Sequence, residues 1–150
     1  MKPDVQWQCL HFNEMTHLQV YQVLQLRSAV FVLEQACAFL DPDNKDLDCY
    51  HVLGFMGQQL VATARLLPAG LAYQELSIGR VATHKEYRRN GIGIGLMQHA
   101  IFYSEQLFSE QPIKIGAQLY LRTFYEKFGF IPTSNVYLED GIEHIEMLRP

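Results

Sequence analysis

The stretch from residue 81 to residue 95 constrains the fold of this chain most strongly. It reads Val-Ala-Thr-His-Lys-Glu-Tyr-Arg-Arg-Asn-Gly-Ile-Gly-Ile-Gly, so a β-rich run ends in a basic, glycine-rich turn, and apolar residues at helical spacing follow. The first amides of a helix have no internal partner and lie at the positive end of the helix dipole, so they can donate to phosphate oxygens. Glycines at 91, 93 and 95 leave room for that approach and permit unusual backbone angles. The stretch therefore predicts an anion-binding turn between a strand and a helix.

The glycine spacing excludes the two commonest nucleotide-binding loops. A Walker loop needs G-x-x-x-x-G-K-[ST], and neither Gly91 nor Gly93 begins such a pattern. The dinucleotide pattern G-x-G-x-x-G fails because position 96 is Leu96. A nucleotide-dependent transferase is therefore disfavoured.

Hydrophobic periodicity along the chain predicts an α/β fold. A capping box of Thr16 and Gln19 begins the first helix, and Gly129 has the position of a helix C-terminal glycine. No linker or internal repeat divides the chain, so we expect one domain over residues 1–150. The expected strands are 5–9, 50–56, 60–67, 76–83, 113–117, 131–138 and 142–148, and the expected helices are 16–35, 92–108 and 119–128.

The charge of the chain is modest in total but uneven along the sequence. Twelve Lys and Arg against sixteen Asp and Glu give a net charge of −4, which argues against a general nucleic-acid binder. Four of the basic residues lie between Arg80 and Arg89, and half of the acids lie in residues 41–48 and 139–146. The basic cluster fits the predicted anion site. Residues 39–48, with a proline and four aspartates, predict an exposed loop.

The sequence predicts neither a metal site nor a membrane segment. Cys9, Cys37 and Cys49 show no C-x-x-C spacing, and the acidic stretch fails as a calcium loop because its sixth and twelfth positions are Asp46 and Val52. No apolar run has the length of a spanning helix or a signal-peptide core. We therefore expect a cytoplasmic protein with no membrane partner.

Two motifs resemble those of one enzyme family. Arg88, Gly91 and Gly93 match the pattern [RQ]-x-x-G-x-[GA], and residues 124–130 read Phe-Tyr-Glu-Lys-Phe-Gly-Phe, as in the family's F-Y-x-x-x-G-F ending of a later helix. In this order and context the chain resembles the GCN5-related N-acetyltransferases (GNAT). The similarity spans essentially the whole chain and narrows to the ElaA-like subgroup. The segments that carry this narrower similarity are Arg27 with 30–35, 78–81, 116–118 and 140–145.

The resemblance implies the GNAT acyl-CoA N-acyltransferase fold, a central mixed and mostly antiparallel sheet flanked by helices. It also implies acetyl-CoA as the acyl donor. The glycine-rich loop would hold the pyrophosphate, the backbone of residues 81–83 would lie beside the pantetheine arm, and Gln118, where the family commonly has asparagine, would contact CoA. The expected cofactor-binding residues are Val81, Ala82, Thr83, Arg88, Arg89, Asn90, Gly91, Ile92, Gly93 and Gln118.

Acetyl transfer to an amine sets three chemical tasks. A lysine-like amine has a pKa of about 10.4, so on the order of one molecule in a thousand is neutral near pH 7 and a proton acceptor helps. The thioester oxyanion needs a hydrogen-bond donor, here the backbone of residues 81–83, and the departing thiolate needs a proton. The family's usual thiolate protonator corresponds to Tyr125.

The general base is the least determined role. Glu75 heads the strand that ends at Val81, and strand alternation would place it on the same side as Val81, facing the cleft. Glu34, His51 and His144 compete for the role. Arg80 is either a contact of substrate or cofactor or a salt-bridge partner.

The expected function is acetyl transfer from acetyl-CoA to a primary amine by direct attack on the thioester. The alternative is a non-catalytic acyl-CoA-binding sensor on the same fold. Small amines, polyamines and peptide amines are the acceptor classes, because residues 41–48 and 139–146 would attract a cation if they bordered the cleft. A homodimer is compatible with the chain.

Overall fold

The computed structural model describes residues 4–150 and contains one mixed sheet. Its strand order is β1-β2-β3-β4-β5-β8-β6, with β7 also paired to β8. The β4–β5 pair is parallel and the other pairs are antiparallel, which confirms the expected sheet. The strands are β1 (Gln6–His11), β2 (Tyr50–Met56), β3 (Gln59–Leu67), β4 (Leu76–Thr83), β5 (Ile113–Gln118), β6 (Ile131–Pro132), β7 (Tyr137–Glu139) and β8 (Ile142–Arg149).

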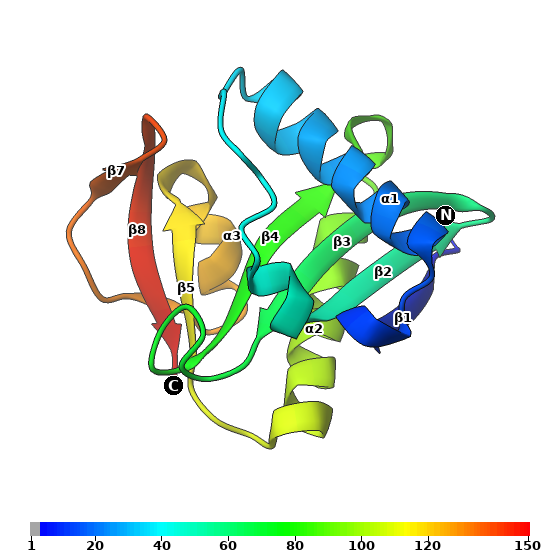
Figure 1. Ribbon diagram of the computed structural model, residues 1–150. Helices are drawn as coiled ribbons and strands as arrows, with labels where there is room; N and C mark the ends of the chain where they lie inside the picture. The colour runs from blue at the N-terminus through cyan, green and yellow to red at the C-terminus, as the bar shows by residue number, and fades with distance from the viewer. Residues whose placement is uncertain (1–3) are drawn as a thin grey trace.

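Helices cover both faces of the sheet. Helix α1 (His17–Arg27) crosses one face, whereas α2 (Ile92–Phe108) and the short α3 (Arg122–Glu126) lie behind the sheet in Figure 1. The larger apolar core lies between the sheet and α2, and a smaller one lies under α1. No helix within residues 4–150 is both long enough and apolar enough to cross a bilayer.

The strands β4 and β5 touch only where they begin. The register pairs Leu76 with Ile113 and Ser77 with Lys114, after which no further pair follows. Figure 1 shows the two strands diverging toward their C-terminal ends. A parallel pair that opens in this way leaves one edge of β4 without a strand partner, and this opening positions the site.

Three expected elements differ in detail. The capping box of Thr16 and Gln19 is confirmed, but α1 ends at Arg27 and continues as a π-helical turn over Ser28–Glu34. The expected helix 119–128 begins as a 3₁₀ turn (Leu119–Leu121) before α3, and Gly129 follows with φ +91° as its position predicted.

The expected strand 131–138 is wrong as one element, since β6 and β7 are separated by four residues. In this gap the hydroxyl of Ser134 accepts from the Glu146 backbone amide at 2.9 Å. A side chain thus satisfies the amide of β8 that a continuous strand would have bonded.

Residues 39–48 are only in part the exposed loop that their composition predicted, because Asp48 is exposed but Asp41 and Asp46 are buried. Asp41 is 3% exposed and Asp46 is 8% exposed, and a 3₁₀ turn (Lys45–Asp48) ends the segment. Their partner Arg27 is 1% exposed and donates to Asp41 at 2.8 Å and to Asp46 at 2.7 Å. The physical reason for the difference is this pairing, since a carboxylate is buried readily only beside a cation.

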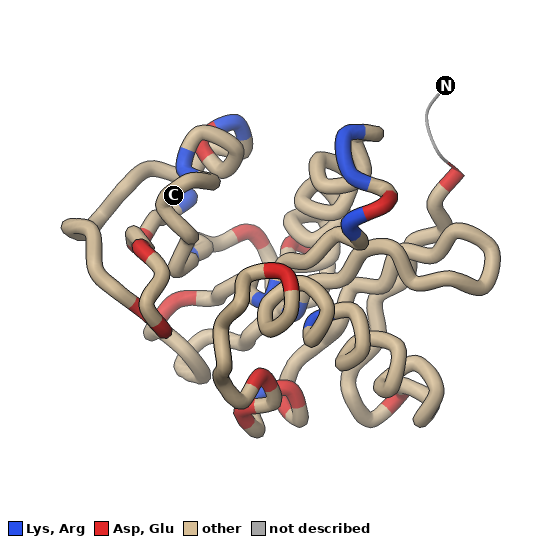
Figure 2. The backbone as a smooth tube through the Cα atoms, turned by 90° about the horizontal axis from the view of Figure 1, so that it is seen from above, with Lys and Arg blue, Asp and Glu red and all other residues tan. Residues whose placement is uncertain are grey.

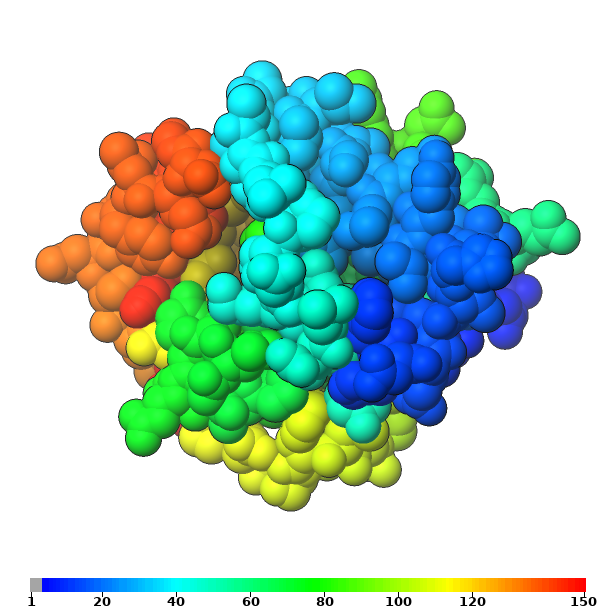
Figure 3. Space-filling view, in the orientation of Figure 1, coloured from blue at the N-terminus to red at the C-terminus, as the bar shows by residue number. Residues whose placement is uncertain are grey.

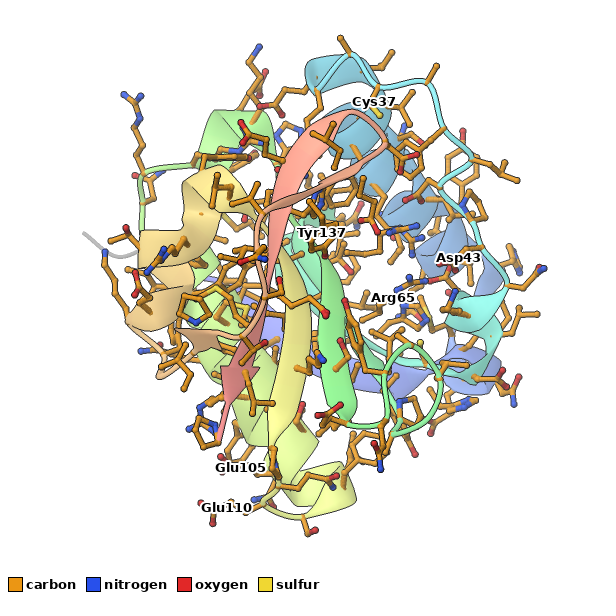
Figure 4. The ribbon with its side chains drawn as sticks, turned by 90° about the vertical axis from the view of Figure 1, so that its left-hand side faces the viewer. Cys37, Asp43, Arg65, Glu105, Glu110 and Tyr137 are labelled. Atoms are coloured by element: carbon orange, nitrogen blue, oxygen red, sulfur yellow. The ribbon has the colours of Figure 1, made fainter. Side chains whose placement is uncertain are left out.

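Two further arginines complete the ion-pair cluster. Arg65 on β3 binds Asp43 through two hydrogen bonds of 2.7 Å each, and the two side chains point toward one another in Figure 4. Arg80 on β4 lies 2.9 Å from the second oxygen of Asp41. Three guanidinium groups therefore face three carboxylates, and the cluster as a whole carries no net charge.

Candidate active site

A β-bulge in β4 creates the opening between β4 and β5. Ala82 pairs with Thr63 and Gly79 pairs with Arg65, so two residues of β4 stand opposite one residue of β3. Arg80 lies in this bulge with φ +47°, a left-handed conformation that is uncommon for a residue with a side chain. Because of the extra residue, the side chains after the bulge lie on the opposite face of the sheet from the one that strict alternation would give them.

The change of phase is visible in the packing of β4. Ile78 packs into the core beneath α2, but Ala82 packs into the core beneath α1, although strict alternation would place both on one face. The alternation that aligned Glu75 with Val81 therefore does not hold through Arg80. Glu75 precedes β4, at the end where β4 and β5 are still paired, and it does not line the cavity described next.

A cavity of about 330 Å³ fills the opening between the diverging strands. Its walls come from β4 and β5, from the π-helical turn and the segment after it, from the turn before α2, from α3 and from the β7–β8 hairpin. In Figure 3 a hollow opens between the cyan segment that follows α1 and the orange hairpin, with the yellow of β5 at its floor. The predicted residues that line the cavity are Val81, Thr83, Arg88, Arg89, Gly93, Gln118 and Tyr125.

The other predicted residues lie outside the cavity wall. Ala82 and Ile92 are buried in the two cores. Gly91 and Asn90 are exposed on the turn before α2. Gly91 occupies the N-cap of α2 with φ +77°, and no side chain caps the helix, so the first amides of α2 are available to an anion.

The charged residues of this turn stand apart from the ion-pair cluster. In Figure 2 the turn before α2 shows blue segments at the edge of the molecule, whereas other basic positions lie in the interior beside red acidic segments. The Arg88 guanidinium forms a two-point ion pair with Glu34 of the π-helical turn and also donates to the Thr83 carbonyl at 3.0 Å. The hydrogen bond from Arg88 holds the pKa of Glu34 below its usual value. The positive charge of Arg88 is therefore balanced by the Glu34 carboxylate.

Tyr125 lies on α3 and lines the cavity. Its side chain is 6% exposed and packs edge-to-face against Phe124 and Phe130. Burial, and then the neighbouring Tyr120, raise the pKa of the Tyr125 phenol. Because the charged form is disfavoured, the phenol keeps its proton and can donate a hydrogen bond at neutral pH.

Gln118 already has a partner across the cleft. Its amide and that of Gln35 exchange two hydrogen bonds, of 3.0 Å and 3.1 Å. Nearby, the Cys37 thiol donates to the Asp140 carbonyl at 3.3 Å, and Figure 4 shows Cys37 close to the tip of the β7–β8 hairpin. These contacts join the segment after the π-helical turn to β5 and to the β7–β8 hairpin, and the residues that make them all line the cavity. To contact CoA, the Gln118 amide must either keep its hydrogen bonds to Gln35 at the same time or break them.

The structure separates the three residues that competed with Glu75 as base. Glu34 is held by Arg88 and lines an adjoining pocket that shares Gln35, Arg88 and Gln118 with the cavity. His51 is buried on β2 and its Nε2 lies 3.0 Å from the Asp46 carbonyl, beside a different and mainly apolar pocket. His144 on β8 lines the cavity, with Glu139 and Asp140 of the same hairpin.

The cavity also contains residues that the sequence did not single out as functional. Gln35 and Phe39 line it, and the ring of Phe39 lies 5.6 Å beneath the Arg80 guanidinium. No local pattern marks these positions, because the contacts join segments that are distant in sequence. Within residues 4–150 no three His, Cys, Asp or Glu side chains are grouped as a metal site.

Comparisons with known proteins agree with this geometry. A family model described as an acetyltransferase (GNAT) domain matches residues 43–149. Protein ElaA of Escherichia coli is 42% identical over 147 residues, which cover 97% of this chain and 96% of that protein. Its crystal structure superposes with a TM-score of 0.92 over 98% of this chain and 100% of that one.

Two further structures resemble this one. An acyl-CoA N-acyltransferase from Pseudomonas aeruginosa gives a TM-score of 0.93 at 37% identity, over 98% of this chain and 100% of that one. The catalytic domain of the Tetrahymena GCN5 histone acetyltransferase, in complex with coenzyme A, gives a TM-score of 0.71 at 13% identity, over 98% of this chain and 94% of that one. At that identity the last likeness concerns the fold alone.

Proposed function

Because this chain belongs to the GNAT acetyltransferase family, we propose that it transfers the acetyl group of acetyl-CoA to a primary amine. The GNAT fold supports acyl transfer from an acyl-CoA, and the choice of acetyl and of an amine is the proposal. One observation carries it: a single cavity joins the turn before α2, the unpaired edge of β4, the Tyr125 phenol and an acidic hairpin. These are the parts that a thioester donor and an amine acceptor need in one place.

The donor would bind along the opening between β4 and β5. Its phosphates would meet the uncapped N-terminus of α2, where Gly93 has no side chain to hold them away from the backbone. Its pantetheine arm would hydrogen-bond the edge of β4 that β5 leaves unpaired beyond Ser77. The Tetrahymena domain of the same fold was crystallised with coenzyme A, which supports CoA as the donor class.

The reaction would proceed by direct attack of the amine nitrogen on the thioester carbon. A carbon–nitrogen bond forms, the carbon–sulfur bond breaks, and the thiolate leaves with a proton. Backbone amides of residues 81–83 are the candidate donors to the oxyanion, and Tyr125 is the candidate donor to the thiolate. A raised pKa suits a phenol that must stay protonated until the thiolate forms.

The family model that matches this chain is described as an acetyltransferase domain, which supports acetyl as the acyl group.

The hairpin supports a cationic acceptor, but residues 41–48 do not. Glu139 and Asp140 line the cavity, so they would attract an ammonium group. Asp41, Asp43 and Asp46 are neutralised by arginines and contribute no free charge. Small amines, polyamines and peptide amines all present such an ammonium.

The test is a thiol-release assay on the purified chain. Acetyl-CoA, butyryl-CoA and octanoyl-CoA would each be offered with ethylamine, spermidine and a lysine-bearing peptide, and acylated product would be identified by mass. We expect release with acetyl-CoA and at least one amine, at a rate that falls as the acyl chain lengthens. Tight acetyl-CoA binding by calorimetry without release for any amine would instead support the non-catalytic sensor.

A further inference from the structure

His144 lies on the face of the sheet that forms the cavity wall. It stands opposite Gln118 in the β5–β8 register and opposite Tyr137 in the β7–β8 register, and opposed residues of antiparallel strands present their side chains on one face. Its side chain is 7% exposed and lines the cavity. Of the four base candidates, His144 lines the cavity itself, Glu34 lines an adjoining pocket while paired with Arg88, and His51 and Glu75 line neither.

The hydrogen bonds of His144 fix where its ring carries a proton. Nδ1 lies 2.8 Å from the Ile142 carbonyl oxygen, which can only accept, so Nδ1 carries the hydrogen. The lone pair of the neutral ring is therefore on Nε2. Nε2 lies 3.4 Å from a carboxylate oxygen of Glu139. A proton placed on Nε2 would face this carboxylate and be stabilised by it.

The ring is held in this orientation from both sides. The Tyr137 ring stacks on it with 5.8 Å between centroids and 30° between planes, and Figure 4 shows Tyr137 in the middle of this sheet face. Together with the Ile142 carbonyl, this stacking fixes the plane of the imidazole. Nε2 thus keeps its direction toward Glu139 whether or not it is protonated.

The other groups around His144 leave Glu139 as its main charged neighbour. Gln118 of β5 is neutral and bonded to Gln35, and the Cys37 thiol is bonded to the Asp140 carbonyl. Asp140 of the β7–β8 turn adds a second negative charge to this wall of the cavity. Farther along the same face, Lys114 and Glu146 pair with each other at 3.6 Å, and Arg80 of β4 faces Asp41. The charged groups nearest to His144 on this wall are therefore carboxylates.

We propose that His144 is the general base of acetyl transfer and that Glu139 is its positioning residue, which stabilises the imidazolium. The proposal rests on the proposed function and assigns its acceptor end to the β7–β8 hairpin. The ammonium nitrogen of a primary amine gives one proton to Nε2, and its freed lone pair attacks the thioester carbon. The carbon–sulfur bond breaks, and the second proton of the nitrogen leaves with the thiolate as thiol. One proton is then released from His144 to water.

The kinetic test compares amines of different basicity. His144→Gln and Glu139→Gln would be measured against ethylamine and against trifluoroethylamine, in which fluorine lowers the amine pKa so that the nitrogen is already neutral near pH 7. His17→Gln, on the exposed start of α1, and Glu110→Gln, on the exposed segment after α2, are the matched controls. Figure 4 shows Glu110 at the opposite end of the molecule from the hairpin tip.

We expect His144→Gln to lower kcat/KM for ethylamine at pH 7 by about a hundredfold. For trifluoroethylamine the loss should shrink to a few fold, because no proton has to be removed before attack. Glu139→Gln should also lower kcat/KM for ethylamine more than for trifluoroethylamine, because it removes the carboxylate that faces the proton received by Nε2. An equal loss for both amines would overturn the assignment, since a structural role does not depend on amine basicity.

A second measurement decides the assignment without turnover. Imidazole ¹⁵N resonances of the whole chain, with His144 identified by its absence in His144→Gln, report the tautomer and the titration of the ring. We expect the neutral ring to carry its proton on Nδ1 both in the unaltered protein and in Glu139→Gln. A neutral ring protonated on Nε2 would overturn the proposal. If no amine is acetylated by the unaltered protein, the proposed function fails. The spectrum still shows whether the neutral His144 ring carries its proton on Nδ1.

Discussion

The Arg88 guanidinium is bound at two points by the Glu34 carboxylate, although Arg88 begins the turn that is expected to hold phosphate. Glu34 comes from the π-helical turn that continues α1, so an element on one side of the cleft reaches the anion site on the other. An incoming pyrophosphate would meet both charges. It must therefore displace Glu34 from Arg88, and the negative Glu34 carboxylate also repels it.

We expect Glu34→Gln to tighten acetyl-CoA binding about fivefold at low salt. The substitution removes a negative charge beside the expected phosphate position and frees the Arg88 guanidinium to turn toward the phosphate. Calorimetry at two salt concentrations measures this, and the gain should shrink at the higher one. Glu110→Gln removes the same charge at a distant exposed position and should leave affinity unchanged. Weaker binding in Glu34→Gln would mean that Glu34 instead holds Arg88 in its binding position.

Two glycines in the first turn of α2 offer a matched pair. A Cβ on Gly93 would lie 3.8 Å from the Thr83 hydroxyl and 3.9 Å from the Phe124 ring, ordinary contacts that face the cavity. A Cβ on Gly95 would face Trp7 instead, at 3.3 Å. We expect the free energy of unfolding of both alanine variants to lie within about 1 kcal/mol of that of the unaltered protein, because alanine favours a helix over glycine.

Their binding should differ. In Gly93→Ala the added methyl group occupies space between the strand and the helix terminus, so we expect acetyl-CoA affinity to fall at least about tenfold, which corresponds to roughly 1.4 kcal/mol. Gly95→Ala should bind acetyl-CoA as the unaltered protein does. Equal affinities for the two variants would place the phosphate away from this turn.

Much of the fold could be predicted because its signals are local. The capping box of Thr16 and Gln19, the neighbouring strands β2 and β3 and the glycine after α3 each depend on residues within a few positions of one another. The break between β6 and β7 could not be predicted in this way. It depends on Ser134 bonding an amide of β8 twelve residues later in the chain.

The site was predictable only where its residues belong to one motif. Local sequence motifs predict the turn before α2 and Tyr125, and both line the cavity. By contrast, Gln118 bonds Gln35, which is 83 residues away in sequence. The bulge at Arg80 also has no composition signal, since the residue is an arginine in a conformation typical of glycine. It was this bulge that invalidated the alternation behind Glu75.

The buried ion pairs should make stability depend on acid pH. Burial alone would raise the pKa of Asp46, but hydrogen bonds and charge from Arg27 and then Arg65 outweigh it, so this pKa lies below its usual value. A carboxyl group whose pKa is lowered by folding stabilises the protein fully above its unfolded pKa of about 3.9. This contribution is lost as pH falls below that value and through the lower pKa of the folded state.

Asp46→Asn should therefore cost about 3 kcal/mol in the free energy of unfolding at pH 7, since it leaves buried guanidinium charge uncompensated. The difference from the unaltered protein should narrow as pH falls below about 4. Urea unfolding followed by the fluorescence of Trp7, the single tryptophan, measures both. Asp48→Asn, two positions away but exposed, is the control and should cost less than about 0.5 kcal/mol. A cost of that size for Asp46→Asn as well would contradict a stabilising role of the cluster.

Tyr125→Phe removes one hydroxyl and keeps the packing of the ring. Burial raises the pKa of this phenol above its usual value of about 10, whereas a thiol has a pKa of about 8.5, so complete proton transfer from Tyr125 to the thiolate is uphill. The phenol should thus act by donating a hydrogen bond to the developing thiolate and passing on its proton only as another proton replaces it.

On this basis we expect Tyr125→Phe to lower kcat for acetyl transfer by about 10- to 100-fold while the acetyl-CoA dissociation constant changes less than twofold. Tyr21→Phe, on an exposed position of α1, is the matched control and should leave kcat unchanged. Because the phenol stays protonated, the pH profile of the unaltered protein should show no alkaline limb from Tyr125 below about pH 10. An unchanged kcat in Tyr125→Phe across the amine panel would remove Tyr125 from the chemistry and leave it a packing residue of α3.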